Sequence, residues 1–149
     1  MPSLHERASP LLPRLTADNY RETSAATWDY NCIAWALGIT DAWWWPSPDR
    51  YWPENMPREE SLPSFLAAFA TVNFLPDDSP VLEPDVEKVA LYALGPKRTH
   101  AARQLPGGWW TSKLGPAIDI EHATPDAVAG GMYGEVVIIL SRKRLLSES

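Results

Sequence analysis

The sequence predicts one α+β domain, in which N-terminal helices pack on a small antiparallel β-sheet. Two observations carry this prediction. Apolar residues recur at helical spacing in the first half of the chain, and strand-like segments separated by Gly and Pro turns fill the second half. A chain of 149 residues, 45% of them hydrophobic, is long enough for one domain with a buried core. We therefore expect helices first and a sheet second, in a layered arrangement.

The chain divides into an arm, a domain and a tail. Residues 1–27 are expected to form an irregular N-terminal arm, because prolines in its first half interrupt any long helix. The α+β domain is expected to span residues 28–141. Residues 142–149, which begin with basic side chains, form the expected C-terminal tail.

The first helix begins at the only cysteine of the chain. Asn31, or Asp29 before it, can cap a helix that starts at Cys32, and Gly38 can end it, because glycine adopts the left-handed conformation without steric cost. Trp35 follows Cys32 at i+3 and shares its face. A thiol in the first turn of a helix has a lowered pKa, so we predict that Cys32 is a nucleophile. The alternative is that Cys32 is a small, buried apolar residue.

A segment dense in tryptophan and proline follows this helix. The three successive tryptophans at 43–45 cannot all face inward on one element, so at least one lies on the surface or lines a cleft. One interpretation is a substrate-facing wall, with Trp44 and Trp45 as substrate contacts. The other is a loop held in place by aromatic side chains beneath it.

The second helix has clearer signals. Ser61 is its expected N-cap, and Leu62, Phe65, Leu66 and Phe69 recur at helical spacing, which predicts a helix with one face toward the core.

Strand signals dominate the rest of the chain. The expected elements, in order, are strands 88–93, 99–105 and 109–114, an extended piece 117–122, a helical turn 124–128 and a strand 133–140. The first three are expected to form an antiparallel meander. The last has a continuous β-branched run, which predicts a central strand covered on both faces.

A cysteine nucleophile needs a base, and histidine suits this role because its pKa lies nearest neutrality. His5 lies in the expected arm, whereas His100 heads a predicted strand on the rigid part of the fold. We therefore predict that His100 is the base, the alternative being an ordinary half-exposed sheet residue. Among possible groups to orient its imidazole, Asp119 is the best choice, because a carboxylate fixes the tautomer and stabilises imidazolium. Further candidates for this role are Ser112, Glu121 and His122.

The start of the first helix is also a source of oxyanion donors. Backbone N–H groups there lack partners within the helix, and the side chains of Tyr30 and Asn31 could add a donor. Ser112 joins the two tryptophans as an expected substrate contact. No cofactor and no metal is expected, because one cysteine excludes a multi-cysteine zinc site and the three histidines are scattered.

The overall charge narrows the function classes. A net charge of −6 and a pI near 5.0 disfavour binding to nucleic acid or to an anionic membrane. The N-terminus lacks the apolar run of a signal peptide, and no window approaches a membrane span. We therefore expect a cytoplasmic protein, with export by a dedicated secretion system left open.

Four segments together resemble a known arrangement: YNCIAWALG (30–38), THAARQL (99–105), WTSKLG (110–115) and DIEH (119–122). They look like an uncharacterised family of small bacterial proteins. Their order of cysteine, histidine and polar residue is similar to that of papain-like hydrolases, in particular the NlpC/P60 and CHAP-type peptidases and amidases. The resemblance implies a papain-like α+β fold, with Cys32 as nucleophile and His100 as base. The chain departs from the wall-cutting relatives in having no recognisable export signal or wall-binding repeat.

The expected function is that of a cysteine hydrolase, which transfers an acyl group from a peptide, amide or ester substrate through a thiolate. Two alternatives stay open. One is a non-enzymatic binding module that uses the tryptophan-rich segment 43–52, and the other is a toxin or effector domain with the same triad.

Overall fold

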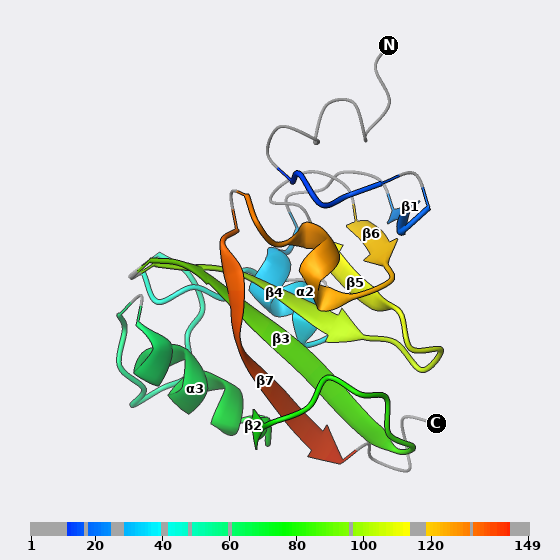
Figure 1. The fold of residues 1–149 in the computed structure, drawn as a ribbon. Helices are drawn as coiled ribbons and strands as arrows, with labels where there is room; N and C mark the ends of the chain where they lie inside the picture. Colours follow the sequence, from blue (N-terminus) through cyan, green and yellow to red (C-terminus); the bar gives the residue numbers. More distant parts are fainter. Residues whose placement is uncertain are drawn as a thin grey trace.

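The computed structural model describes residues 12–16, 18–24, 29–39, 42–47, 49–59, 61–95, 97–113, 119–131 and 133–143, with backbone alone at 24 and 97–99. These residues form a seven-stranded sheet in the order β1-β6-β5-β4-β3-β7-β2, and every neighbouring pair is antiparallel (Figure 1). The strands are β1 (Tyr20–Ser24), β2 (Leu75–Asp77), β3 (Val86–Leu94), β4 (Lys97–Gln104), β5 (Trp110–Lys113), β6 (Asp119–His122) and β7 (Glu135–Lys143). The predicted meander is confirmed, because β3, β4 and β5 pair in succession.

The papain-like prediction, with helices packed on a small sheet, is wrong. The sheet dominates, and the described helices are α2 (Cys32–Ala36), α3 (Leu62–Ala70) and the 3₁₀ turn η1 (Pro125–Val128). The prolines between α2 and α3 leave irregular backbone there rather than further helix. The caps of both helices are confirmed, since Asn31 accepts from the N–H of Ala34 and Ser61 from the N–H of Ser64.

The arm and the last strand also differ from expectation. Tyr20–Ser24, within the segment expected to be irregular, forms an edge strand paired with β6. Residues 133–140 were predicted to form a central strand covered on both faces. The strand is confirmed as β7, which pairs with β3 on one side and β2 on the other, but the coverage of both faces is wrong, because Val137 is 44% exposed. His5 and the tail from residue 144 lie outside the described residues.

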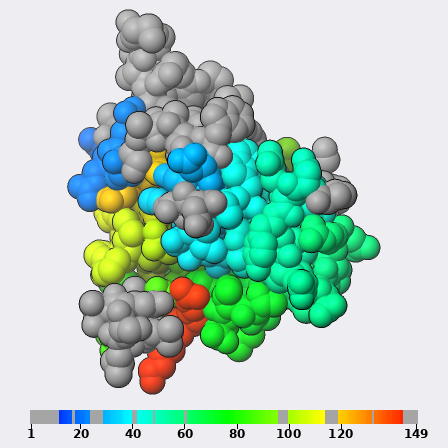
Figure 2. Space-filling view, turned by 180° about the vertical axis from the view of Figure 1, so that it is seen from behind, coloured from blue at the N-terminus to red at the C-terminus, as the bar shows by residue number. Residues whose placement is uncertain are grey.

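Two hydrophobic clusters cover the two faces of the sheet. The helix-side cluster joins α2 and α3 to one face, where it includes Val89, Leu91, Ala101 and Leu140. The turn-side cluster joins η1 to the other face, where it includes Ala90, Tyr92, Ala102 and Trp110. Successive strand residues point to opposite faces, which explains how neighbours such as Ala101 and Ala102 belong to different clusters. In Figure 2, which views the molecule from behind, residues from α2 through α3 gather in cyan and green over the helix side.

Among the described residues, no helix has the length and apolar character needed to cross a bilayer.

Candidate functional site

A pocket of about 250 Å³ opens at the start of α2. The described residues that line it are Asn31, Cys32, Trp43 and Trp45. The Cys32 side chain is largely buried, with 9% exposed, and the two tryptophans are half-buried. The predicted nucleophile therefore lies in the wall of an apolar pocket.

Backbone pairing decides which tryptophans face this pocket. The Tyr51 N–H donates to the Trp43 carbonyl, and the Trp45 N–H donates to the Tyr51 carbonyl, so residues 43–45 run extended. Alternate residues of an extended segment share a side, and Trp43 and Trp45 therefore line the pocket while Trp44 is buried away from it. Of the two predicted substrate contacts, Trp45 lies at the pocket and Trp44 does not. The same alternation could have indicated Trp43 from the sequence.

The polar atoms of Asn31 are already used by the fold. Its Oδ1 accepts from the backbone N–H groups of Ala34 and Trp44, and its Nδ2 donates to the Trp44 carbonyl. The bond to the Trp44 carbonyl uses one of the two N–H donors of Nδ2, so the predicted role of Asn31 as an oxyanion donor would depend on the other. Tyr30 is similarly engaged, because its hydroxyl donates to Asp119.

Backbone N–H groups converge on the Cys32 sulfur. They belong to Cys32 itself, to Ile33 and to Ala101, and each favours the thiolate. Burial outweighs them and raises the pKa of the Cys32 thiol to about 11, although the Lys113 ammonium also acts to lower it. The thiol is thus neutral in this state.

The Ala101 N–H reaches Cys32 because of where strand pairing ends. Among the described residues, β4 pairs with β5 through Arg103 and Gln104, and Ala101 lies beyond this pairing. The α2 helix packs on β4 and β5 at this point. The sulfur thus accepts a hydrogen bond from a strand residue that directly follows His100.

His100 itself belongs to the other face of the sheet. Its ring stacks on Tyr133, with centroids 4.0 Å apart, and lies 5.2 Å from the ring of Tyr92. The side chain is fully buried, and neither ring nitrogen has a hydrogen-bond partner among the described residues. Burial, with a smaller effect from His122, holds the pKa of His100 well below its usual range. The structure brings the backbone of His100 next to Cys32, but no hydrogen bond joins its imidazole to the sulfur.

The predicted orienting group, Asp119, lies elsewhere. It is fully buried, accepts from the Tyr30 hydroxyl and pairs in register with Lys113. The Lys113 ammonium lies 5.0 Å from the centre of the Tyr30 ring, and desolvation lowers its pKa. Burial and the Asp119 carboxylate together raise the pKa of Tyr30 to about 12. Asp119 therefore acts on Tyr30 and Lys113 rather than on His100, and Lys113 is close enough to Cys32 for its charge to act on the thiol.

Ser112 and His122 form a buried pair of their own. The Ser112 Oγ lies 2.7 Å from His122 Nε2, and His122 Nδ1 lies 2.7 Å from the Thr124 carbonyl. A carbonyl only accepts, so Nδ1 carries the proton and Nε2 accepts from the Ser112 hydroxyl. Burial lowers the pKa of His122 to about 4. Neither residue lines the pocket, and the remaining candidate, Glu121, pairs with Arg21 on the surface.

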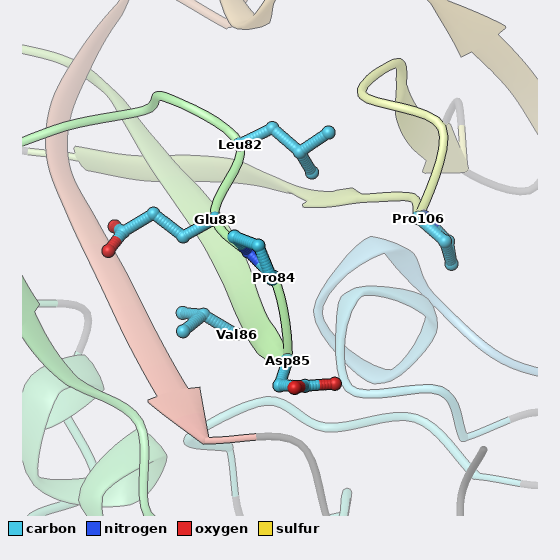
Figure 3. A pocket seen from close by; sticks show the side chains of 6 residues that line it. All are labelled: Leu82, Glu83, Pro84, Asp85, Val86 and Pro106. Carbon is cyan, nitrogen blue, oxygen red and sulfur yellow. The ribbon is translucent and has the colours of Figure 1, made fainter.

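A second hollow, of about 450 Å³, is an open groove between residues 82–86 and Pro106 (Figure 3). Its lining mixes apolar side chains with the carboxylates of Glu83 and Asp85. Glu83 points away from Pro106 and pairs with Lys88. The described residues of this groove include no nucleophile or base other than carboxylates, so it is a weaker candidate for chemistry than the pocket at Cys32.

Metal ligands do not gather in the part of the chain that the structure describes: it contains no group of three His, Cys, Asp or Glu side chains that could hold an ion.

Comparison with protein families gives one match, which spans residues 21–141 and is described as a domain of unknown function, DUF7689. The chain belongs to the DUF7689 family. No curated protein and no solved structure matches it. The DUF7689 match does not link the chain to NlpC/P60 or CHAP peptidases.

Proposed function

We propose that this DUF7689 protein is a cysteine hydrolase that binds part of a peptide, amide or ester substrate in the tryptophan pocket and transfers its acyl group through Cys32. The observation that carries the proposal is the position of the thiol. It lies in the wall of a pocket, beneath two tryptophans, and accepts a hydrogen bond from the residue that follows His100.

His100 is the proposed base. Its imidazole is neutral, because burial lowers its pKa, and both ring nitrogens lack partners among the described residues. Hydrogen bonds between catalytic groups are often long or misaligned before substrate binds. The proposal therefore requires the imidazole to leave its stack on Tyr133 and approach the sulfur in the substrate complex.

The chemical step is acyl transfer. The thiol proton passes to His100 as Sγ bonds to the carbonyl carbon, and the C–N or C–O bond then breaks as the same proton passes to the leaving amine or alcohol. Water next attacks the thioester, places its hydroxyl on the acyl carbon and returns a proton to the sulfur.

The test is the hydrolysis of small p-nitrophenyl esters by wild type, His100→Ala and Cys32→Ser, because the proposed pair forms only when substrate is bound. We expect turnover in wild type, at least tenfold slower turnover in His100→Ala and none in Cys32→Ser. Equal turnover in wild type and His100→Ala would refute a Cys32–His100 pair. Turnover that persists in Cys32→Ser would refute Cys32 as the nucleophile.

The second candidate is a binding module in which the tryptophan pocket holds a ligand and Cys32 is inert. It is favoured by the raised pKa of the buried thiol. In that case wild type turns over no ester and a ligand still binds in the pocket. For either function we propose a cytoplasmic location, without a nucleic acid or membrane partner, in line with the acidic composition.

A further inference from the structure

We infer that the pocket beside Cys32 selects an uncharged, ring-sized group of its ligand, such as an aromatic side chain or acyl group. The inference deepens the proposed function. It rests on that function only where it calls the ligand a substrate, because the selectivity of the pocket does not depend on catalysis. It follows from the size, the shape and the chemistry of the lining.

The size of the pocket fits a single ring. A dry cavity of roughly 150 Å³ holds benzene, and drug-sized ligands occupy sites of about 300–1,000 Å³. The pocket measures about 250 Å³, so it accommodates one ring with a short substituent.

The shape of the pocket also favours a ring. Trp43 and Trp45 are alternate residues of an extended segment, and such residues lie about 6.5–7 Å apart along the chain. Aromatic rings pack with centroids about 4.5–7 Å apart, so one inserted ring can contact both indoles. The Trp45 ring is held by Phe65, whose ring centroid lies 5.5 Å away in an edge-to-face arrangement.

The chemistry of the lining disfavours a charge. Among the described residues no charged side chain lines the pocket, and the oxygen and one N–H of the Asn31 amide already bond to Ala34 and Trp44. An anion would lose its hydration without meeting a positively charged side chain among these lining residues. A cation would meet the Arg50 guanidinium, which lies 4.7 Å from the Trp43 ring centre. An uncharged group avoids both penalties.

The test compares three probes of one shape: benzyl alcohol, benzylamine and phenylacetate. Their affinity for wild-type protein is measured at pH 7 by ligand-observed NMR titration. We expect benzyl alcohol to bind at least tenfold more tightly than either charged probe. Binding of a charged probe as tight as that of benzyl alcohol would overturn the inference.

Two variants locate the binding. Trp45→Ala is expected to weaken benzyl alcohol at least tenfold, and Trp45→Phe less than threefold, because a ring remains. Trp109→Ala is the matched control, since Trp109 is half-buried beside Arg21 and does not line the pocket. Equal effects of Trp45→Ala and Trp109→Ala would also overturn the inference. If Trp45→Ala does not fold, the affinity of Trp45→Phe for benzyl alcohol and the affinities of wild type for the three probes still test the inference.

The Cys32→Ser variant separates this inference from the proposed function. Selective binding of benzyl alcohol without ester turnover in wild type would sustain the pocket and refute acyl transfer. Ester turnover that depends on Cys32, with no preference among the probes, would sustain acyl transfer and refute the inference.

Discussion

The side chain of Asn31 pairs with the backbone of Trp44 at both of its polar groups. Oδ1 accepts from the Trp44 N–H at 3.1 Å, and Nδ2 donates to the Trp44 carbonyl at 2.8 Å. Because Oδ1 also accepts from the Ala34 N–H at 3.1 Å, one amide both caps α2 and holds the segment that forms the pocket walls. Asn31 thereby sets the position of Trp43 and Trp45 relative to Cys32.

Removing this amide should cost more than removing a helix cap alone. Loss of a cap costs about 1 kcal/mol, and leaving a buried polar group unpaired costs about 1–3 kcal/mol more. We therefore expect Asn31→Ala to lower the free energy of unfolding by about 2–4 kcal/mol in urea denaturation. Ser61→Ala is the matched control, because Ser61 caps α3 through the Ser64 N–H, and it should cost about 1 kcal/mol. Equal losses in the two variants would show that the Trp44 contacts contribute nothing.

The buried histidines should make the protein sensitive to acid. The pKa of His122 is about 4 when folded, against a usual value of 6.5, and that of His100 is also lowered. Between these pH values the unfolded chain binds protons that the folded chain does not, so stability is full above pH 6.5 and falls as the pH falls toward 4. For His122 the loss is of the order of 3 kcal/mol. Urea denaturation at several pH values measures it.

His122→Gln provides the control for this pH dependence. A plot of the free energy of unfolding against pH has a slope set by the number of protons taken up on unfolding. Between pH 6.5 and 4, the slope for His122→Gln should be lower than that of wild type by the equivalent of about one proton. The slope that remains is the contribution of His100. An unchanged slope would mean that His122 is already protonated in the folded protein.

Lys88 is expected to hold the loop before β3 against the sheet. Its side chain is fully buried, and the ammonium lies 2.5 Å from Glu83, 3.6 Å from Asp77 and 2.7 Å from the Ser79 carbonyl. Lys88→Met keeps the apolar stem but removes all three contacts. We expect faster amide hydrogen exchange at residues 79–83, with little change in the slowly exchanging amides of β3. Unchanged exchange in the loop would show that its own packing suffices.

Trp35 should contribute to stability through both its ring and its N–H. It stacks on Tyr30, with centroids 5.2 Å apart, and its Nε1 donates to Thr111 at 2.9 Å. Because the side chain is only half-buried, we expect Trp35→Ala to cost about 3 kcal/mol, the lower end for a core aromatic residue. Thr111→Val removes this acceptor, together with the hydrogen bond that the Thr111 hydroxyl donates to the Ile120 carbonyl, and should cost about 1–3 kcal/mol. A melting curve unchanged by Trp35→Ala would mean that this face of α2 does not pack.

Local sequence signals were sufficient where structure depends on neighbours in the chain. The caps Asn31 and Ser61 were predicted because a cap acts on N–H groups within three residues. The meander of β3, β4 and β5 was predicted because tight turns join its strands. The edge strands β1 and β2 were not predicted, since they become strands by pairing with segments distant in the chain.

The features of the candidate site also fall into those set by local sequence and those set by tertiary contacts. The sequence by itself determined that one cysteine stands at the start of a short capped helix and that two aromatic rings can line a pocket near it. Tertiary structure alone decided that Tyr51 holds residues 43–45 extended, turning Trp43 and Trp45 rather than Trp44 to the pocket. It also decided that Asp119 bonds to Tyr30 and that the imidazole of His100 packs on Tyr133. The physical reason is that a residue's chemical type is local, whereas its partner, and the burial that sets its pKa, depend on segments brought together by folding.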